Sequence, residues 1–231
     1  MVLWLTANIL LLIGAYGLGS FPTGYLAARW LKGIDIRQQG SGSTGATNVL
    51  RTLGKGPAIV VLSIDILKGV GAIALTRWLY TIPLLASLTP STVDSPLWLP
   101  WVVVLAGLAA LLGHSKPIWL NFQGGKSVAT SLGILLALYW PVGLATLGVF
   151  GVSLAISRIV SLSSILGAGA VSILMMVMQQ PLPYTLFAIA GGLYVIWRHR
   201  TNIQRLIAGT EPQLGQKLPP EASKPGLENP Q

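Results

Sequence analysis

The sequence contains no cysteine, which excludes disulfides and thiolate chemistry. Charge is also scarce, since 9% of the 231 residues are charged, against about 25% in ordinary soluble domains. The six acidic residues and two histidines are too few and too scattered for a typical metal cage, and we predict no metal and no cofactor. Hydrophobic residues make up 52% of the chain, which indicates an all-α protein that crosses a membrane several times.

The first nineteen residues carry no charge at all. A secretory signal needs a basic segment before its apolar run and a small-residue cleavage site after it. Here the basic residues Arg29, Lys32 and Arg37 follow the apolar run. We therefore expect a retained first helix with the N-terminus outside.

The apolar runs predict a compact bundle of about seven transmembrane helices, since one span needs roughly 20 apolar residues. The stretch Ser127–Leu162 is long enough for two spans broken at Trp140-Pro141, and the first of these is short enough to be re-entrant. A count of five or six therefore stays open. The expected spans are Leu3–Leu26, Ala58–Tyr80, Leu97–Leu112, the two within Ser127–Leu162, Ser163–Met178 and Tyr184–Trp197.

The cations support this arrangement, because thirteen of the fifteen Lys and Arg residues fall on one side of the predicted bundle. Such an excess is typical of the cytoplasmic side. They are Arg29, Lys32, Arg37, Arg51, Lys55, Lys116, Lys126, Arg158, Arg198, Arg200, Arg205, Lys217 and Lys224. We predict a membrane-embedded domain over residues 1–208, with a cytoplasmic C-terminus. Residues 209–231 are rich in Pro, Gly, Glu and Lys and are predicted to be a disordered tail.

Four polar segments interrupt the apolar chain, and all four lie on the predicted cytoplasmic side. They are Gly40–Arg51, Gly113–Thr130, Arg158–Ser164 and Arg198–Arg205. The net charge of +9 is consistent with ordinary cytoplasmic loops and with an anionic ligand. Backbone amides, hydroxyls and cations at one face of a lipid-embedded protein favour a phosphorylated substrate. Nothing in the pattern points to nucleic acid.

The first two segments have features of phosphate sites. In Gly40–Asn48 (GSGSTGATN), the glycines allow backbone N–H groups to turn toward an anion, and Arg51 follows Thr47 by one turn. Lys126 lies behind two glycines at the start of a predicted helix, although the spacing required for a P-loop is not met. A flexible loop is the alternative for the first segment. An interfacial histidine is the alternative to a site role for His114.

The remaining polar residues allow two interpretations each. Ser161 and Ser164 are expected either to hold helices together or to line a site. The segment Arg198–Arg205 is either a basic stop signal or a ligand-binding helix face, on which His199 and Asn202 lie three residues apart. Asp65 and Lys68 share a face of the second span, as a structural pair or as a substrate contact.

Some catalytic patterns are missing from the sequence. We expect no carboxylate near either histidine to complete a Ser-His-Asp relay. The HxxxxD pattern of many acyltransferases fails, because Trp119 and Gln204 occupy the acidic position. The acid-rich helix of metal-dependent alcohol phosphotransferases is absent as well.

These segments together resemble the PlsY family of bacterial acyl-phosphate:glycerol-3-phosphate acyltransferases. The matching stretches are GSFPTGY from Gly19, DIR from Asp35, GSGSTGATNVLRTLGKG from Gly40, DILKG from Asp65, GHSKPIW from Gly113, FQGGKSVAT from Phe122, VSLSS from Val160 and RHRTNIQRLIAGTE from Arg198. They cover Gly19–Glu211 in order. Ser43 departs from the asparagine that is common in the family.

The resemblance implies transfer of a fatty acyl group from acyl phosphate to the 1-hydroxyl of glycerol 3-phosphate, giving lysophosphatidic acid and phosphate. It implies a multi-pass protein of the bacterial plasma (inner) membrane with its site facing the cytoplasm. The soluble enzyme that makes acyl phosphate is a candidate partner. The substrate-binding residues expected are Gly40, Ser41, Gly42, Thr47, Asn48, Arg51, Lys68, His114, Gly125, Lys126, Ser161, Ser164, Arg198, His199, Asn202 and Arg205, with catalysis assigned to Ser41, Lys126, His199 and Asn202.

Two other functions compete with this one. An organic-anion transporter requires polar residues that are reachable from both faces, whereas the predicted outer loops contain no Lys or Arg. A structural protein that binds anionic headgroups through its basic side is the second alternative. It does not account for loops rich in glycine and hydroxyls.

Overall fold

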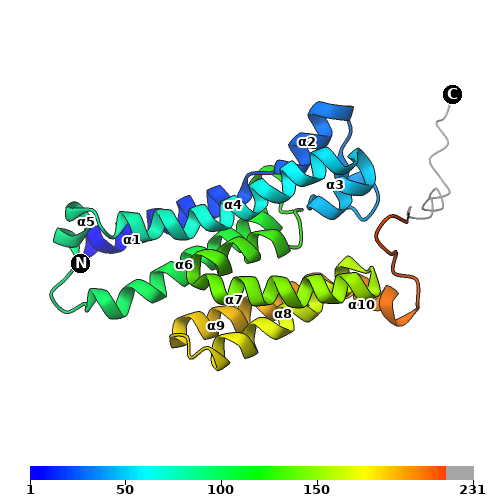
Figure 1. Ribbon diagram of the computed structural model, residues 1–231. Coiled ribbons are helices and arrows are strands. Elements are labelled where there is room, and N and C mark those ends of the chain that lie inside the picture. Colours follow the sequence, from blue (N-terminus) through cyan, green and yellow to red (C-terminus); the bar gives the residue numbers. More distant parts are fainter. Residues whose placement is uncertain (217–231) are drawn as a thin grey trace.

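The computed structural model describes residues 1–216, and this part of the chain is helical without strands. The α-helices are α1 (Val2–Ser20), α2 (Thr23–Lys32), α3 (Ala46–Leu53), α4 (Lys55–Leu79), α5 (Pro83–Leu88), α6 (Ser95–Ser115), α7 (Val128–Ser157), α8 (Val160–Val177), α9 (Leu182–Arg198) and α10 (Arg200–Ile207). Two short 3₁₀ helices, η1 (Ile36–Gln38) and η2 (Ile118–Leu120), lie in the connections. The long helices run side by side in an elongated bundle (Figure 1).

Five segments are long and apolar enough to cross a membrane: Val2–Lys32, Lys55–Leu79, Ser95–Leu120, Val128–Ser157 and Val160–Val177. The prediction of an all-helical, multi-pass membrane protein is therefore confirmed. The apolar helix α9 has 17 residues, slightly fewer than the length expected of a span.

The first predicted span, Leu3–Leu26, is wrong as a single helix, because α1 ends at Ser20 and α2 begins at Thr23. Pro22 has no backbone N–H and disfavours helical geometry in the residue before it. Phe21 accordingly has φ −57° and ψ 116°. Pro22 therefore separates the span from a short helix at the polar end of the bundle.

The expected break near Trp140-Pro141 lies at Tyr139, which has φ −155° and ψ 98° inside α7. A Cβ added to Gly143 would lie 2.9 Å from the backbone N of Leu136. Residues seven apart in a straight helix are separated by roughly 10 Å along the axis. The second half of α7 therefore folds back against the first.

Arg77 stabilises this break. Pro141 has no N–H to donate to the carbonyl of Ala137, so that oxygen loses its partner within the helix. The Arg77 guanidinium donates to the oxygens of Ala137 (2.6 Å) and Leu138 (3.2 Å) and to the hydroxyl of Tyr184 (3.1 Å). A cation thus caps the C-terminus of the first half of α7, where the helix dipole is negative.

Glycines bring the central helices into close contact. A Cβ at Gly69 of α4 would overlap the carbonyl of Thr130 in α7, and one at Gly133 of α7 would overlap the carbonyl of Ile66 in α4. Small residues allow such close approach of helix backbones in membranes. The main hydrophobic core lies among α4, α6, α7, α8 and α9.

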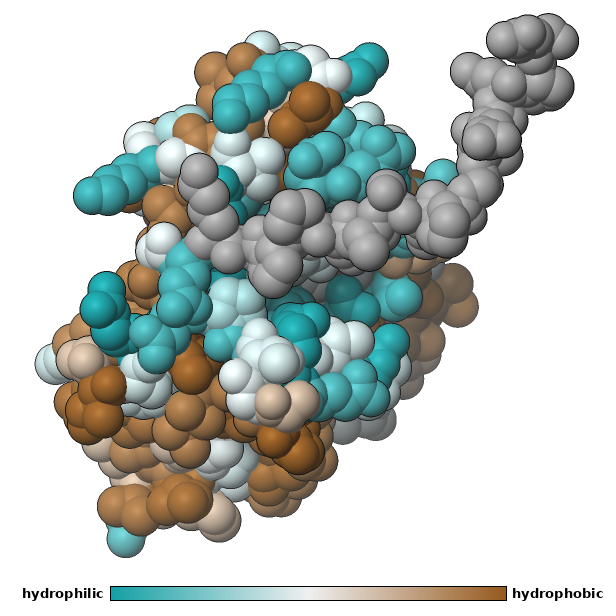
Figure 2. Space-filling model, turned by 90° about the vertical axis from the view of Figure 1, so that its right-hand side faces the viewer, coloured by the Kyte–Doolittle hydropathy of each residue, from teal (hydrophilic) through white to brown (hydrophobic). Residues whose placement is uncertain are grey.

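The four polar segments meet at one end of the bundle. Figure 1 shows α2, α3 and α10 at this end, opposite the N-terminus and α5. Figure 2 looks onto this end and shows hydrophilic residues across it, with apolar residues along its flanks.

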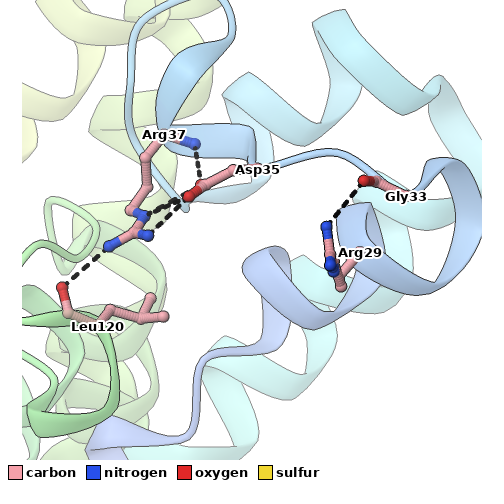
Figure 3. A network of polar contacts seen from close by, with 5 residues as sticks. All are labelled: Arg29, Gly33, Asp35, Arg37 and Leu120. Carbon is pink, nitrogen blue, oxygen red and sulfur yellow. Dashed lines mark hydrogen bonds and ion pairs between the residues drawn. The ribbon is translucent and has the colours of Figure 1, made fainter.

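Arg37 connects the polar segment Gly113–Thr130 to the part of the chain that leads into Gly40–Arg51 (Figure 3). Its guanidinium pairs with Asp35 (2.6 Å) and donates to the carbonyl of Leu120 in η2 (3.1 Å). It also lies 5.3 Å from the ring centroid of Tyr25. The glycine-rich loop before α3 is thus fixed against the connection between α6 and α7.

Candidate active site

A cavity of about 660 Å³ opens at the polar end of the bundle. It has a polar part and an apolar part. The polar part is lined by Ser41, Ser43, Thr47, Asn48, Arg51, Asp65, His114, Lys126, Ser127, Ser161, Ser164, His199, Asn202 and Glu211. These residues come from all four polar segments, from α4 and from the start of the C-terminal segment.

The loop before α3 forms one wall. Gly40 and Gly42 have φ values of 56° and 67°, which residues with side chains rarely adopt. Asn48 is buried and holds the loop closed, because its side-chain N–H groups donate to the carbonyls of Gln39 and Ser43 (2.9 Å each). Its side-chain oxygen accepts from the N–H of Ser41 (3.0 Å). We therefore interpret Asn48 as the residue that shapes this loop.

The turn that carries Lys126 forms the opposite wall. The N–H of Gly125 donates to the carbonyl of His114 (3.2 Å), and a Cβ at Gly125 would overlap Nε2 of that histidine. Arg198 donates to the carbonyl of Gly125 (2.9 Å) from the other side. Ser127, with φ 64°, then starts α7 and donates to the carbonyl of Leu111 (2.9 Å). Glycine is needed at position 125 because the His114 ring occupies the space that a side chain would fill.

Lys126 is at the centre of a polar network. Its Nζ donates to Oδ1 of Asn202 (2.5 Å), and Nδ2 of Asn202 donates to Glu211 (2.6 Å). The Glu211 carboxylate also accepts from Ser161 (2.7 Å) and pairs with Arg205 (2.6 Å). One carboxylate thus connects α8 to α10 and, through Asn202, to the turn that carries Lys126.

The charges in this network are set by burial and by their neighbours. Burial lowers the pKa of Lys126 to about 8, and the cations Arg205, Arg198 and Arg51 add to this, whereas Glu211 opposes it. Burial by itself would raise the pKa of Glu211, but hydrogen bonds from Ser161, Asn202 and Arg205 hold it below the ordinary value. At neutral pH, the network therefore contains a charged lysine and a carboxylate.

His199 lies between α9 and α10 and is 3% exposed. Its Nδ1 is 2.7 Å from the carbonyl of Val195. Burial lowers the pKa of His199 to about 4, partly offset by that hydrogen bond. The imidazole is therefore neutral at physiological pH.

His114 contacts the ion pair that the sequence places in α4. Lys68 Nζ lies 2.9 Å from Oδ1 of Asp65 and 3.0 Å from Nδ1 of His114, and all three side chains are buried. The expectation that no carboxylate lies near a histidine is wrong for His114, because Asp65 Oδ1 is 3.7 Å from its Nδ1. The two residues are close in space although they are far apart in sequence.

The apolar part of the cavity extends into the bundle among α4, α7, α8 and α9. It includes Val171 in α8 and Phe187 in α9. The ten residues from Ser161 to Val171 correspond to roughly 15 Å of helix. Ile59 and Leu62 of α4 line this part and are also 62% and 42% exposed, so it lies next to an apolar flank of the bundle. A long hydrocarbon chain fits such a space, with its polar end among the cations.

Ten of the sixteen predicted binding residues line this cavity, including all four with an assigned catalytic role. These ten are Ser41, Thr47, Asn48, Arg51, His114, Lys126, Ser161, Ser164, His199 and Asn202. The other six lie behind the wall or outside it: Gly40, Gly42, Lys68, Gly125, Arg198 and Arg205. Their contacts shape the wall of the cavity, and the roles of all sixteen remain predictions.

Glu211 was not among the site residues predicted from the sequence. The residue falls in the segment predicted to be a disordered tail, yet it is 9% exposed and holds the network together. The N–H of Leu214 donates to the carbonyl of Arg158 (2.6 Å), so the start of this segment packs against the α7–α8 turn. The motif that ends in Gly-Thr-Glu was the signal available. The rest of the predicted tail, residues 217–231, lies outside the described residues.

Comparisons with known proteins agree with this arrangement. A sequence model of the family described as glycerol-3-phosphate acyltransferase matches residues 9–209. The glycerol-3-phosphate acyltransferase of Trichormus variabilis is 67% identical over 224 residues, covering 97% of this chain and 99% of that protein. That of Acaryochloris marina is 61% identical over 217 residues, covering 94% and 96%.

Two crystal structures of PlsY (YgiH), described as an integral membrane glycerol 3-phosphate acyltransferase, have a similar fold. The glycerol 3-phosphate form is 36% identical with a TM-score of 0.79, covering 90% of this chain and 96% of that chain. The lysophosphatidic acid form is 35% identical with a TM-score of 0.76, covering 90% and 95%.

Proposed function

We propose that this chain, which belongs to the glycerol-3-phosphate acyltransferase family, transfers a fatty acyl group from acyl phosphate to the 1-hydroxyl of glycerol 3-phosphate. The products are lysophosphatidic acid and inorganic phosphate, at the start of phospholipid synthesis. One observation carries the proposal: a single cavity joins a cationic, hydroxyl-rich end to an apolar arm long enough for an acyl chain.

The polar end suits two phosphate-bearing reactants. Arg51 and Lys126 line it from opposite walls, and the N-terminus of α3 adds positive potential beside Thr47. Ser41, Ser161 and Ser164 add hydroxyls that can donate hydrogen bonds to phosphate oxygens. Such donors stabilise the charge that develops on the reacting oxygens.

Acyl phosphate is an activated mixed anhydride, so the chain's main task is to position the reactants. The 1-hydroxyl oxygen forms a bond to the acyl carbonyl carbon, and the bond from that carbon to the phosphate oxygen breaks. The phosphate leaves with the electron pair, and the hydroxyl proton has to reach a base.

We assign the proton to the departing phosphate, with His199 as the alternative acceptor. A general base is most effective when its pKa lies near the working pH. The pKa of His199 is lowered to about 4, which makes it a weak proton acceptor, whereas phosphate groups titrate near neutrality. His199 then accepts a hydrogen bond from the hydroxyl and orients it. A His199→Gln enzyme with full turnover and normal substrate affinity would exclude the histidine as base.

The proposed setting is the bacterial plasma (inner) membrane, with the cavity facing the cytoplasm. The excess of Lys and Arg in the loops at the polar end supports this orientation, which places the N-terminus outside. We count seven spans by taking the two halves of α7 separately and including α9. The cytoplasmic side is where a soluble enzyme that makes acyl phosphate would deliver its product.

The direct test uses purified protein in lipid nanodiscs with acyl phosphate and labelled glycerol 3-phosphate. We expect lysophosphatidic acid and inorganic phosphate in equal amounts. Acyl-CoA and acyl carrier protein replace acyl phosphate in parallel reactions and should give no product. Product from either of these at the same rate would contradict the choice of donor, although not the acceptor.

The same preparation in sealed vesicles distinguishes an enzyme from a transporter. Uptake of glycerol 3-phosphate without formation of lysophosphatidic acid would contradict the proposal. We expect product and no uptake.

A further inference from the structure

The two histidines of this chain line one cavity, and each has an Nδ1 atom that is already engaged. A neutral imidazole carries one proton, and the hydrogen bond at one nitrogen decides which nitrogen holds it. The partners of the two Nδ1 atoms therefore determine what each ring presents to a ligand at Nε2.

At His199 the partner of Nδ1 is an acceptor. The carbonyl oxygen of Val195 lies 2.7 Å away, and a carbonyl has no proton to donate. Nδ1 must therefore carry the proton, which leaves a lone pair at Nε2. His199 presents a hydrogen-bond acceptor.

At His114 the partner of Nδ1 is a donor. Lys68 Nζ lies 3.0 Å away and forms an ion pair with Asp65 (2.9 Å), and an ammonium group donates only. Asp65 Oδ1 is 3.7 Å from the same ring nitrogen, which is too long for a hydrogen bond. Nδ1 is therefore unprotonated, and the proton is on Nε2, beside Gly125.

We propose that the two imidazoles are held in opposite neutral tautomers, so that His114 donates a hydrogen bond into the cavity while His199 accepts one. Lys68 is then a positioning residue, which acts by fixing the tautomer of His114. It lies behind the cavity wall and donates a further hydrogen bond to the carbonyl of Phe21 (3.0 Å), which holds the ammonium in place.

The pair suits the reaction proposed above, and this part of the inference rests on that function. His199 accepts from the attacking hydroxyl of glycerol 3-phosphate. His114 donates to an oxygen of acyl phosphate, next to the turn that carries Lys126. The two reactants need opposite hydrogen-bonding partners, and two rings of the same residue type supply them.

Nuclear magnetic resonance with ¹⁵N-labelled histidine tests the tautomers directly. The chain has only two histidines, so a preparation with a tag free of histidine gives two imidazoles, and a His199→Gln variant assigns them. We expect a proton on Nε2 of His114 and on Nδ1 of His199 at neutral pH. The same tautomer in both rings, or a proton on Nδ1 of His114, would overturn the proposal, whatever the enzyme catalyses.

A Lys68→Met variant tests the positioning role. We expect the His114 signal to change from a single tautomer to a mixture, while the His199 signal stays unchanged and reports that the fold is intact. An unchanged His114 tautomer in the folded variant would exclude a positioning role for Lys68.

Two substitutions of His114 test the donor at Nε2. The amide of glutamine reaches the position of Nε2, whereas that of asparagine reaches only Nδ1. We expect kcat to fall less than about tenfold in His114→Gln and by about a hundredfold in His114→Asn, the usual effect of losing one donor to the reacting oxygens. Equal losses in the two variants would contradict donation by His114. If the wild-type protein made no lysophosphatidic acid, the proposed function would be wrong. The ¹⁵N spectrum would still determine the tautomers of the two histidines.

Discussion

Replacing Lys126 by methionine removes one cation from the cavity and keeps a side chain of similar length. Two unit charges about 4 Å apart attract by roughly 4 kcal/mol at the effective dielectric constant typical near a protein surface. Arg51 remains in the cavity and compensates part of this loss. We therefore expect a loss of about 3 kcal/mol in the interaction with substrate phosphate. This corresponds to a fall of roughly two orders of magnitude in kcat/KM.

The assay is the initial rate of lysophosphatidic acid formation at varied concentrations of glycerol 3-phosphate. Lys116→Met is the matched control, because Lys116 belongs to the same connection between α6 and α7 but is exposed and lies outside the cavity wall. We expect the control to remain within a small factor of wild type. Equal kcat/KM values for wild type, the control and a folded Lys126→Met would refute the assignment of Lys126 to phosphate.

Three further predictions concern charge and capping. The pKa of Lys126 is lowered to about 8 and its charged form binds the anion, so kcat/KM should fall as pH rises through about 8. Initial rates measured across alkaline pH should show this fall, and in Lys126→Arg the fall should occur at higher pH. Glu211→Gln should lower the free energy of unfolding by about 2 kcal/mol, because the uncharged side chain forms weaker hydrogen bonds. We expect thermal unfolding at a lower temperature, together with a loss of activity. Arg77→Met should lower stability by a similar amount, since the carbonyl of Ala137 loses its donor, yet leave kcat/KM close to wild type, because Arg77 lies outside the cavity wall. A stable Arg77→Met protein with a large loss of activity would contradict this division of roles.

The sequence predicted helix breaks well where they depend on the backbone chemistry of a single residue. Proline lacks an N–H wherever it occurs, so the break before Pro141 was predictable from one residue. Pro22 acts in the same way, but an apolar run continues past it, and hydropathy alone concealed the end of α1. Counting apolar residues thus locates a span but does not show where its helix ends.

The polar part of the cavity was predictable to the extent that its residues lie in recognisable segments. Ser41, Lys126 and His199 each belong to a glycine-rich or cationic segment, and all three line the cavity. The approach of Asp65 to His114 was not predictable, because it depends on how α4 packs against α6. No periodicity within either helix encodes that contact.

Glu211 shows a further limit of composition. A polar, proline-rich stretch is expected to remain in solvent, but one carboxylate surrounded by Ser161, Asn202 and Arg205 gains enough hydrogen bonds to be buried. Composition averages over a segment, whereas burial is decided by the partners of individual atoms.

The position of Glu211 has a practical consequence for anyone producing this protein. Truncating the chain at the end of α10 would delete the carboxylate that joins α8 to α10, so a shortened protein should be purified in poor yield and without activity. Affinity tags and fluorescent fusions are better attached after residue 216, where they leave the hydrogen bond between Leu214 and Arg158 undisturbed.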